Sequence, residues 1–228
     1  KFYLHDDAML AEPGSFPTEE QSSSTAAVTW TGAATIRSMN TTAGLSQVGP
    51  TGSSIGDHNS QAHLIRTFVS RPLAGITTID ANTWTFSYAF AESNAAANFL
   101  LDGINLYVWR PATAAKVGTI IDNTNTDQGG EAGTSETASS WTVSGSQVTG
   151  VQDGDVLIFE VWATFTQSMS AVYTLTFYYD GTTEGSTTSN AADLSTPQTL
   201  TFDAGGGTGA YSATTAVGAT NQQGLFIS

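Results

Sequence analysis

The chain has 228 residues, with 6 Lys and Arg against 20 Asp and Glu, which gives a formal charge of −14. A surface this negative repels nucleic acid and anionic membranes, so no nucleic-acid partner and no membrane insertion are expected. Cysteine is absent, which excludes a disulfide framework, thiolate catalysis and cysteine-bound zinc. Charged residues make up 11% of the chain, about half the usual share. Ser, Thr, Asn and Gly replace them, as in particle coats, adhesins and carbohydrate binders.

Alternation of bulky and small side chains predicts strands along the whole chain. Between 84 and 90, Trp84, Phe86, Tyr88 and Phe90 share one face, which is typical of a half-buried strand. The stretch 104–109 is bulky on both faces, so we expect a central strand that is covered on both sides. The other strands are expected, in chain order, at 2–4, 27–31, 35–39, 63–70, 116–122, 141–143, 147–151, 155–166, 171–179 and 199–202.

These strands predict an all-β fold: a two-sheet antiparallel sandwich, jelly-roll-like, with an extended C-terminal segment. The best helix candidate, 89–100, is rejected because strand patterns flank it on both sides. Gln152 to Asp155 reads as a tight turn that precedes a strand. The polar stretch 123–140 is expected to be a mobile surface loop.

Two parts are expected along the chain: a sandwich domain at 1–203 and a Gly-hinged extension at 204–228. Three successive glycines, 205–207, form the predicted hinge. The extension ends in the apolar residues Leu225, Phe226 and Ile227. They could fold back onto their own domain or form an intersubunit contact by adding a strand to a neighbour. The sequence leaves both alternatives open.

One catalytic pattern occurs, the G-x-S-x-G of a nucleophile elbow, with Ser54 in the nucleophile position of residues 52–56. The mechanism needs a strand before this serine and a helix after it. The flanking residues read as loop on both sides. In a chain so rich in Gly and Ser, we interpret the match as chance and expect a loop.

Metal ligands are few. The histidines are His5, His58 and His63, and the spacing of the last two fits neither a helical pair nor one strand face. No cofactor is therefore expected. A structural calcium ion stays open, because loop acids supply hard oxygen ligands without matching the EF-hand template. These acids and amides are Asp122, Asn123, Asn125, Asp127 and Glu131, with a second group at Asp153 and Asp155.

Glu160 is the acid to inspect for glycoside hydrolysis, but no partner carboxylate can be placed beside it. The simpler interpretation is an outward charge that discourages sheet association. Five tryptophans could supply a sugar platform. We expect Trp84 and Trp162 in the core or partly in it, and Trp109 and Trp141 exposed as glycan-stacking candidates, because each of the latter borders a polar stretch.

Several short segments, in this order, resemble virion structural proteins of tailed bacteriophages. They are Lys1-Phe2-Tyr3-Leu4-His5, Thr67-Phe68-Val69-Ser70-Arg71-Pro72-Leu73, Val108-Trp109-Arg110-Pro111 and Thr176-Phe177-Tyr178-Tyr179-Asp180-Gly181-Thr182. The resemblance covers residues 1–203 and implies a place in a virus particle, as a capsid decoration or tail-associated protein. It carries no functional residues across.

The leading hypothesis is therefore a non-enzymatic structural subunit of a virion or similar extracellular assembly. Its expected partners are other copies of itself, in a homo-oligomer, and other virion proteins. The alternative is a carbohydrate-binding sandwich that holds surface glycans on exposed Trp and Tyr. A hydrolase is the third and weakest hypothesis.

Overall fold

The computed structural model describes residues 1–8, 28–30, 36–40, 44, 46–49, 51–54, 63–123, 131–165, 173–183 and 189–203. Strands dominate these residues, and the regular helix among them is one 3₁₀ turn, η1 (Pro111–Thr113). The described part of the chain holds no helix with the length and apolar character needed to cross a membrane. The strands are β1 (Phe2–Ala8), β2 (Val28–Trp30), β3 (Ile36–Asn40), β4 (Thr51–Ser54), β5 (His63–Ser70), β6 (Thr78–Ile79), β7 (Thr83–Glu92), β8 (Phe99–Arg110), β9 (Ala115–Asn123), β10 (Thr137–Ser144), β11 (Val148–Thr149), β12 (Val156–Phe165), β13 (Thr174–Tyr178) and β14 (Asp193–Ser195).

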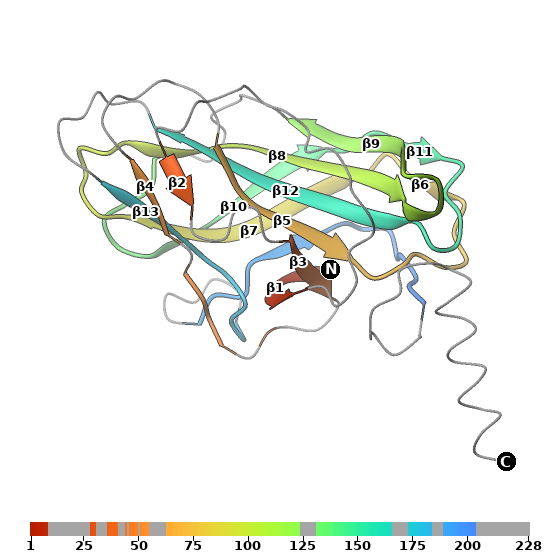
Figure 1. Cartoon of the computed structure of the whole chain (residues 1–228), viewed down its shortest axis with the longest axis horizontal. Helices are drawn as coiled ribbons and strands as arrows, with labels where there is room; N and C mark the ends of the chain where they lie inside the picture. Colours follow the sequence, from red (N-terminus) through yellow and green to blue (C-terminus); the bar gives the residue numbers. More distant parts are fainter. Residues whose placement is uncertain are drawn as a thin grey trace, which may run out of the picture.

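Twelve strands form one curled sheet, in the order β2-β4-β13-β7-β14-β1-β3-β5-β12-β8-β9, with β10 on the second edge of β7. The sheet curls into a β-sandwich. One layer is built around β7 and β10, the other contains β5, β12, β8 and β9, and β1 and β3 connect them (Figure 1). The small sheet β11-β6 lies at one end. The predicted all-β sandwich is confirmed.

Strand pairing differs from the prediction in one place. β3 and β5 run parallel, with Ile36 beside Thr67 and Met39 beside Ser70, so the sheet is mixed rather than wholly antiparallel. The pairing is possible because β4 and the connection around it separate the two strands in sequence. A parallel pair cannot be joined by a tight hairpin.

The core lies between the two layers and is rich in aromatic rings. Phe86 of β7 meets Phe159 of β12 edge to face, with ring centroids 5.2 Å apart. Phe68 of β5 meets Tyr179 in the same way at 5.3 Å. All four residues are fully buried. Burying each such side chain stabilises the fold by about 2 kcal/mol, so these cross-layer pairs fix the spacing of the layers.

A second cluster covers the opposite face of β5, β8 and β12. It consists of Val69, Tyr107, Trp109, Val156 and Ile158, with Ile36 packed against it. Tyr107 and Val69 flank Ile158 on the two neighbouring strands. This confirms the prediction of a central strand at 104–109 that is covered on both sides.

Two predicted loops are wrong in part. Thr51–Ser54, which includes the serine of the G-x-S-x-G pattern, is the strand β4 and pairs with β2 and β13. Thr137–Ser140, placed in a mobile loop, begins β10. Both segments are polar and lack a strong alternation of bulky side chains, so their strand character depends on the strands they pair with. The turn at Gln152 to Asp155 is confirmed, with Gly154 at a φ of 91°.

Candidate functional site

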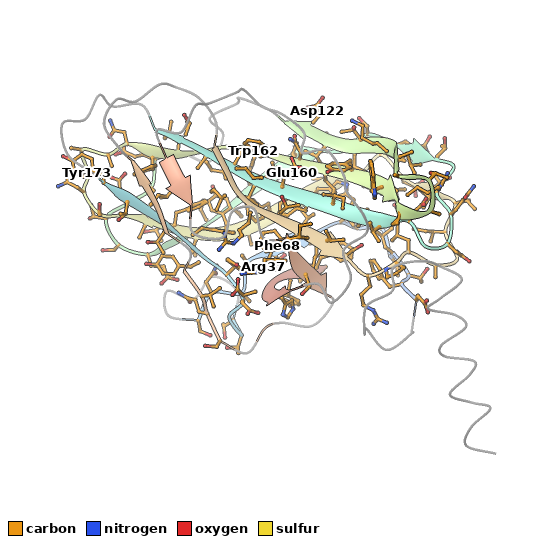
Figure 2. All side chains as sticks on the ribbon, in the orientation of Figure 1. Arg37, Phe68, Asp122, Glu160, Trp162 and Tyr173 are labelled. Atoms are coloured by element: carbon orange, nitrogen blue, oxygen red, sulfur yellow. The ribbon has the colours of Figure 1, made fainter. Side chains whose placement is uncertain are left out.

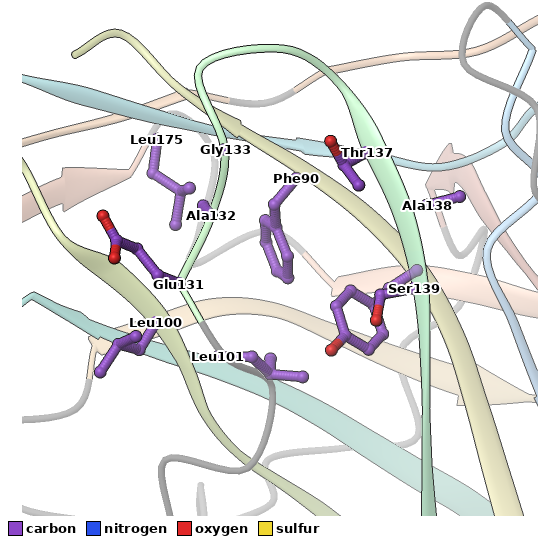
Figure 3. A pocket seen from close by; sticks show the side chains of 11 residues that line it. Phe90, Leu100, Leu101, Glu131, Ala132, Gly133, Thr137, Ala138, Ser139 and Leu175 are labelled. Carbon is purple, nitrogen blue, oxygen red and sulfur yellow. The ribbon is translucent and has the colours of Figure 1, made fainter. Parts of the chain in front are cut away.

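A cavity of about 270 Å³ opens between the two layers beside β10. Figure 3 shows Phe90 in its centre, Glu131 and Leu100 on one side, and Thr137 and Ser139 on the other. Its lining residues come from β7, β8, β10, β13 and the segment before β10. They are Tyr88, Phe90, Leu100, Leu101, Glu131, Ala132, Gly133, Thr137, Ala138, Ser139 and Leu175.

The cavity has an apolar floor and a polar rim. Tyr88, Phe90, Leu101 and Leu175 are each at most 5% exposed, so their side chains present an apolar surface below the opening. Thr137 and Ser139 of β10 are exposed. Burial raises the pKa of the Tyr88 hydroxyl, and its hydrogen bond with Ser139 opposes that shift. The cavity therefore suits an apolar group flanked by hydrogen-bonding atoms.

A buried acid, Glu92, lies at the end of β7 next to this lining. Its backbone N–H donates to Gly133 at 2.8 Å, and its Oε2 accepts from the Phe99 N–H at 3.1 Å. Its Oε1 has no hydrogen-bond partner among the described residues. Burial raises the pKa of Glu92, the Phe99 bond opposes the shift, and the charge of Glu131 adds to it. Glu92 therefore binds its proton more tightly than an exposed glutamate does.

The strand β10 forms an open edge beside the cavity. It pairs with β7 over eight residues, from Thr137 with Phe90 to Ser144 with Thr83, without a register shift. Among the described residues no other strand pairs with β10. Its sequence, TASSWTVS, contains no charge and no proline. Sheet edges are usually protected by charges, prolines or bulges, and β10 has none of these.

The geometry of the β7 ladder shows which β10 groups face outward. Glu92 directs its N–H toward Gly133, just ahead of β10, so even-numbered residues of β7 bond toward β10 and meet its odd-numbered residues. The even-numbered residues Ala138, Ser140 and Thr142 therefore direct their backbone N–H and C=O groups to the open edge. Ser140 and Thr142 are exposed.

Glu160 is not an outward charge, and that prediction is wrong. It is fully buried in the middle of β12, beside Trp162 (Figure 2). Its Oε2 accepts from Trp162 Nε1 at 3.2 Å and from Asn105 Nδ2 at 3.4 Å, while Oε1 accepts from the Tyr107 hydroxyl at 3.4 Å. The cause is that this face of β12 is covered, so an acid there needs donors around it.

The predicted exposure of Trp109 and Trp141, on which their glycan-stacking role depended, is also wrong. Trp109 is 3% exposed and packs in the second cluster, while Trp141 is 7% exposed and points from β10 into the core. Both rings lie on covered faces of their strands, so the polar residues next to them in the sequence do not make them exposed. The predictions for Trp84 and Trp162 are confirmed, because both are buried.

The candidate metal ligands are used elsewhere or lie outside the described residues. Asp155 is bound by Arg110, and Asp153 Oδ1 accepts from the Gly75 N–H at 2.7 Å. His5 Nδ1 lies 3.1 Å from Asp180 Oδ1. Asp122 is exposed on β9 (Figure 2). In the parts of the chain that are described, no three His, Asp or Glu side chains converge on a metal position. Asn125, Asp127 and His58 fall outside these parts, as do the side chains of Ser54, His63 and Asn123.

The apolar residues Leu225, Phe226 and Ile227 also lie outside the described residues, with the whole extension 204–228. Their role as an intersubunit contact stays a prediction.

The cavity and the β10 edge were not predicted from the sequence. One signal was available: Ser139, Trp141 and Val143 alternate with Ser140 and Thr142. With small hydroxyl residues on both faces, that alternation is weak. The cavity itself depends on Leu101 and Leu175, which are distant in sequence and meet through strand order.

No known protein-family model matches the chain, and no curated protein matches it. One similar solved structure is titled "CBM4 structure and function", with a TM-score of 0.29 and 11% identity over 65% of this chain and 83% of that one. Another is titled "Structure of infectious bursal disease virus Gx strain", with a TM-score of 0.32 and 11% identity over 73% of this chain and 34% of that one. At these scores the similarities carry no argument about function.

Proposed function

We propose that the chain is a non-enzymatic structural subunit of a virus particle or similar extracellular assembly, acting through contacts between subunits. The observation that supports this best is the open edge of β10. Copies with a charge of −14 repel one another over most of their surface. β10 is an eight-residue strand without charge, so it adds nothing to that repulsion, and within the described parts of the chain its outer edge has no partner strand.

The hydrogen-bond partners of two buried acidic side chains support a non-enzymatic role. Glu160 is enclosed by Trp162, Asn105 and Tyr107. Asp155 is bound to Arg110. These carboxylates hold strands and turns in place, so they serve the scaffold. The finer placement, as a capsid decoration or tail-associated protein of a tailed bacteriophage, rests on the sequence resemblance alone.

Light scattering coupled to size-exclusion chromatography tests the proposal on the full chain over a range of concentrations. We expect a mass that rises above one chain as concentration increases, and more steeply at high salt, because salt screens the repulsion. A constant single-chain mass at every concentration and salt level contradicts the proposal.

A carbohydrate-binding role is the second candidate, and the cavity favours it. Tyr88 and Phe90 offer aromatic surface, while Glu131, Thr137 and Ser139 offer hydrogen-bonding oxygens. This arrangement replaces the exposed tryptophans of the original hypothesis. Because Trp141 lies two residues from Ser139 on β10, a sugar in the cavity should change tryptophan fluorescence. A glycan panel that leaves the fluorescence of the wild type unchanged contradicts this role.

A further inference from the structure

We propose that the β10 edge and the adjoining cavity receive the C-terminal residues 224–228 of a second copy of this chain, added as a strand to the sheet. The inference rests on the proposed structural function and names the contact that would carry it. Main-chain hydrogen bonds would come from the edge, and the cavity would select the side chains. This division of roles is typical of strand addition.

The first argument is the fit between the edge and the cavity. The inward residues of β10 are Thr137, Ser139 and Trp141, and the first two line the cavity and are exposed. A strand added beside β10 would place every second side chain over that opening. Below it lie Phe90, Leu101 and Leu175, which are almost fully buried. An incoming strand with two apolar residues spaced two apart would cover this floor.

The second argument is the sequence of the extension. Leu225 and Ile227 are spaced two apart, so in a strand they share one face, with Phe226 on the other. Residues 204–228 contain no Asp, Glu, Lys or Arg. A segment without charge meets an edge without charge, so neither side contributes to the repulsion between copies. Leu225 and Ile227 are the side chains that we assign to the cavity.

The extension is long enough to reach a second copy. Among the described residues no strand other than β7 pairs with β10, and Ser139, Ser140 and Thr142 are exposed. The described domain ends at Asp203, whose N–H donates to Pro72 O near the start of β12. The cavity lies near Phe99, which pairs with the last residue of β12. Asp203 therefore lies at the end of the sandwich opposite the cavity, and 25 residues span about 80–90 Å when fully extended, which is long enough to reach the cavity of a neighbouring copy.

A pair of complementary variants tests this arrangement in the full chain. Ser140→Pro removes an N–H that faces the open edge while leaving the bonds of the odd-numbered residues to β7 in place. The double variant Leu225→Asp with Ile227→Asp leaves the β10 edge intact and replaces the two apolar side chains of the segment with carboxylates. We expect the affinity between copies to fall at least about tenfold for each variant alone, compared with the wild type. Mixed together, they should form a dimer with one copy of each, because one has a working segment and the other a working edge.

Three controls make the result specific. Ser140→Ala keeps the backbone N–H and should assemble as the wild type does. Phe226→Tyr changes only the outward face of the added strand and should also assemble. Ser139→Phe fills the cavity from β10 itself and should weaken association although the edge remains open. Near-ultraviolet circular dichroism confirms that each variant keeps its packed core.

The outcomes separate this inference from the proposed function. A wild type that stays monomeric contradicts both this inference and the proposed structural function. A wild type that assembles while both blocking variants assemble equally well leaves the structural function standing and overturns this contact. Failure of the mixed variants to form the two-copy complex also overturns it, as does a glycan that occupies the cavity without affecting assembly.

Discussion

Arg110 holds the carboxylate of Asp155 with two parallel hydrogen bonds, Nε to Oδ1 and Nη2 to Oδ2, each 2.8 Å long. The Asp155 side chain is 1% exposed and also accepts from the Gln152 N–H at 2.9 Å. The same Arg110 Nη2 donates to Gly150 O at 2.7 Å. One guanidinium thus ties the end of β8 to the turn that precedes β12.

Replacing Arg110 should destabilise the domain because the buried carboxylate of Asp155 loses its counter-charge. For Arg110→Ala we expect the free energy of unfolding to fall by about 3 kcal/mol. Arg110→Lys should recover only part of this, since an ammonium group cannot form the two-pronged contact. Urea denaturation measures both. A loss below about 1 kcal/mol for Arg110→Ala, as for a surface ion pair, would contradict the prediction.

Tyr179 should make the domain sensitive to alkali. Its hydroxyl donates to Asp6 Oδ1 and accepts from Arg66 Nε at 3.3 Å, and burial raises its pKa to about 12. Between pH 10 and 12 the folded state holds this proton and the unfolded state releases it. The free energy of unfolding should therefore fall across that range, by about 2–3 kcal/mol from this group.

The variant Tyr179→Phe isolates this contribution. Stability measured by denaturation at successive pH values should decline less steeply in the variant than in the wild type above pH 10. Below pH 10 the two curves should run parallel. Equal slopes above pH 10 would show that Tyr179 does not carry the effect.

Glu92 should lower stability as the solution is brought from acid to neutral pH. Its pKa is raised above the ordinary 4.5 by burial, with a contribution from Glu131. The folded state then binds the proton more tightly than the unfolded state, so deprotonation above pH 4.5 favours unfolding. Glu92→Gln should be more stable relative to the wild type at neutral pH than at pH 4.

Glu131→Gln serves as the matched control, because it removes only the neighbouring charge. It should reduce the pH dependence without abolishing it. Denaturation curves at a series of pH values compare the three proteins. A stability difference between Glu92→Gln and the wild type that is the same at pH 4 and pH 7 is the contradicting result.

Gly145 should tolerate no side chain. A Cβ there would lie 2.7 Å from Cδ1 and Nε1 of Trp84 and 3.0 Å from Ile120 Cγ2. Trp84 is fully buried, so it cannot move aside easily. Gly145→Ala should cost about 1–3 kcal/mol by overpacking. Thermal unfolding of Gly133→Ala is the control, since its nearest neighbour would be 3.5 Å away. Equal melting temperatures for the two variants would contradict the prediction.

The sequence predicted β7, whose alternation is strong, but only the stretch 141–143 of β10, whose alternation is weak. Trp84, Phe86, Tyr88 and Phe90 identify β7 because four aromatic residues share a face. β10 offers only Trp141 and Val143 among hydroxyl residues, so its strand character depends on pairing with β7. Alternation is a local property, whereas pairing depends on the partner.

The candidate site was harder to predict than the fold. The bulky residues on both faces of 104–109 correctly indicated a strand covered twice, and Trp109 belongs to that strand. Its polar neighbours in sequence pointed the other way. Glu160 shows the same limit: alternation gives its face, but the donors Asn105 and Tyr107 come from β8 and depend on strand order.

The position of β1 has a consequence for the making of the protein. β1 pairs with β3 on one side and with β14 on the other, where Phe2 meets Leu194. The β1–β3 ladder can form while the chain is still being synthesised. The join to β14 has to wait until nearly the whole domain has left the ribosome. Joining two strands so far apart in sequence costs a large loop-closure entropy, so the sandwich should fold slowly. The free edge of β1 stays unpaired until β14 has been synthesised.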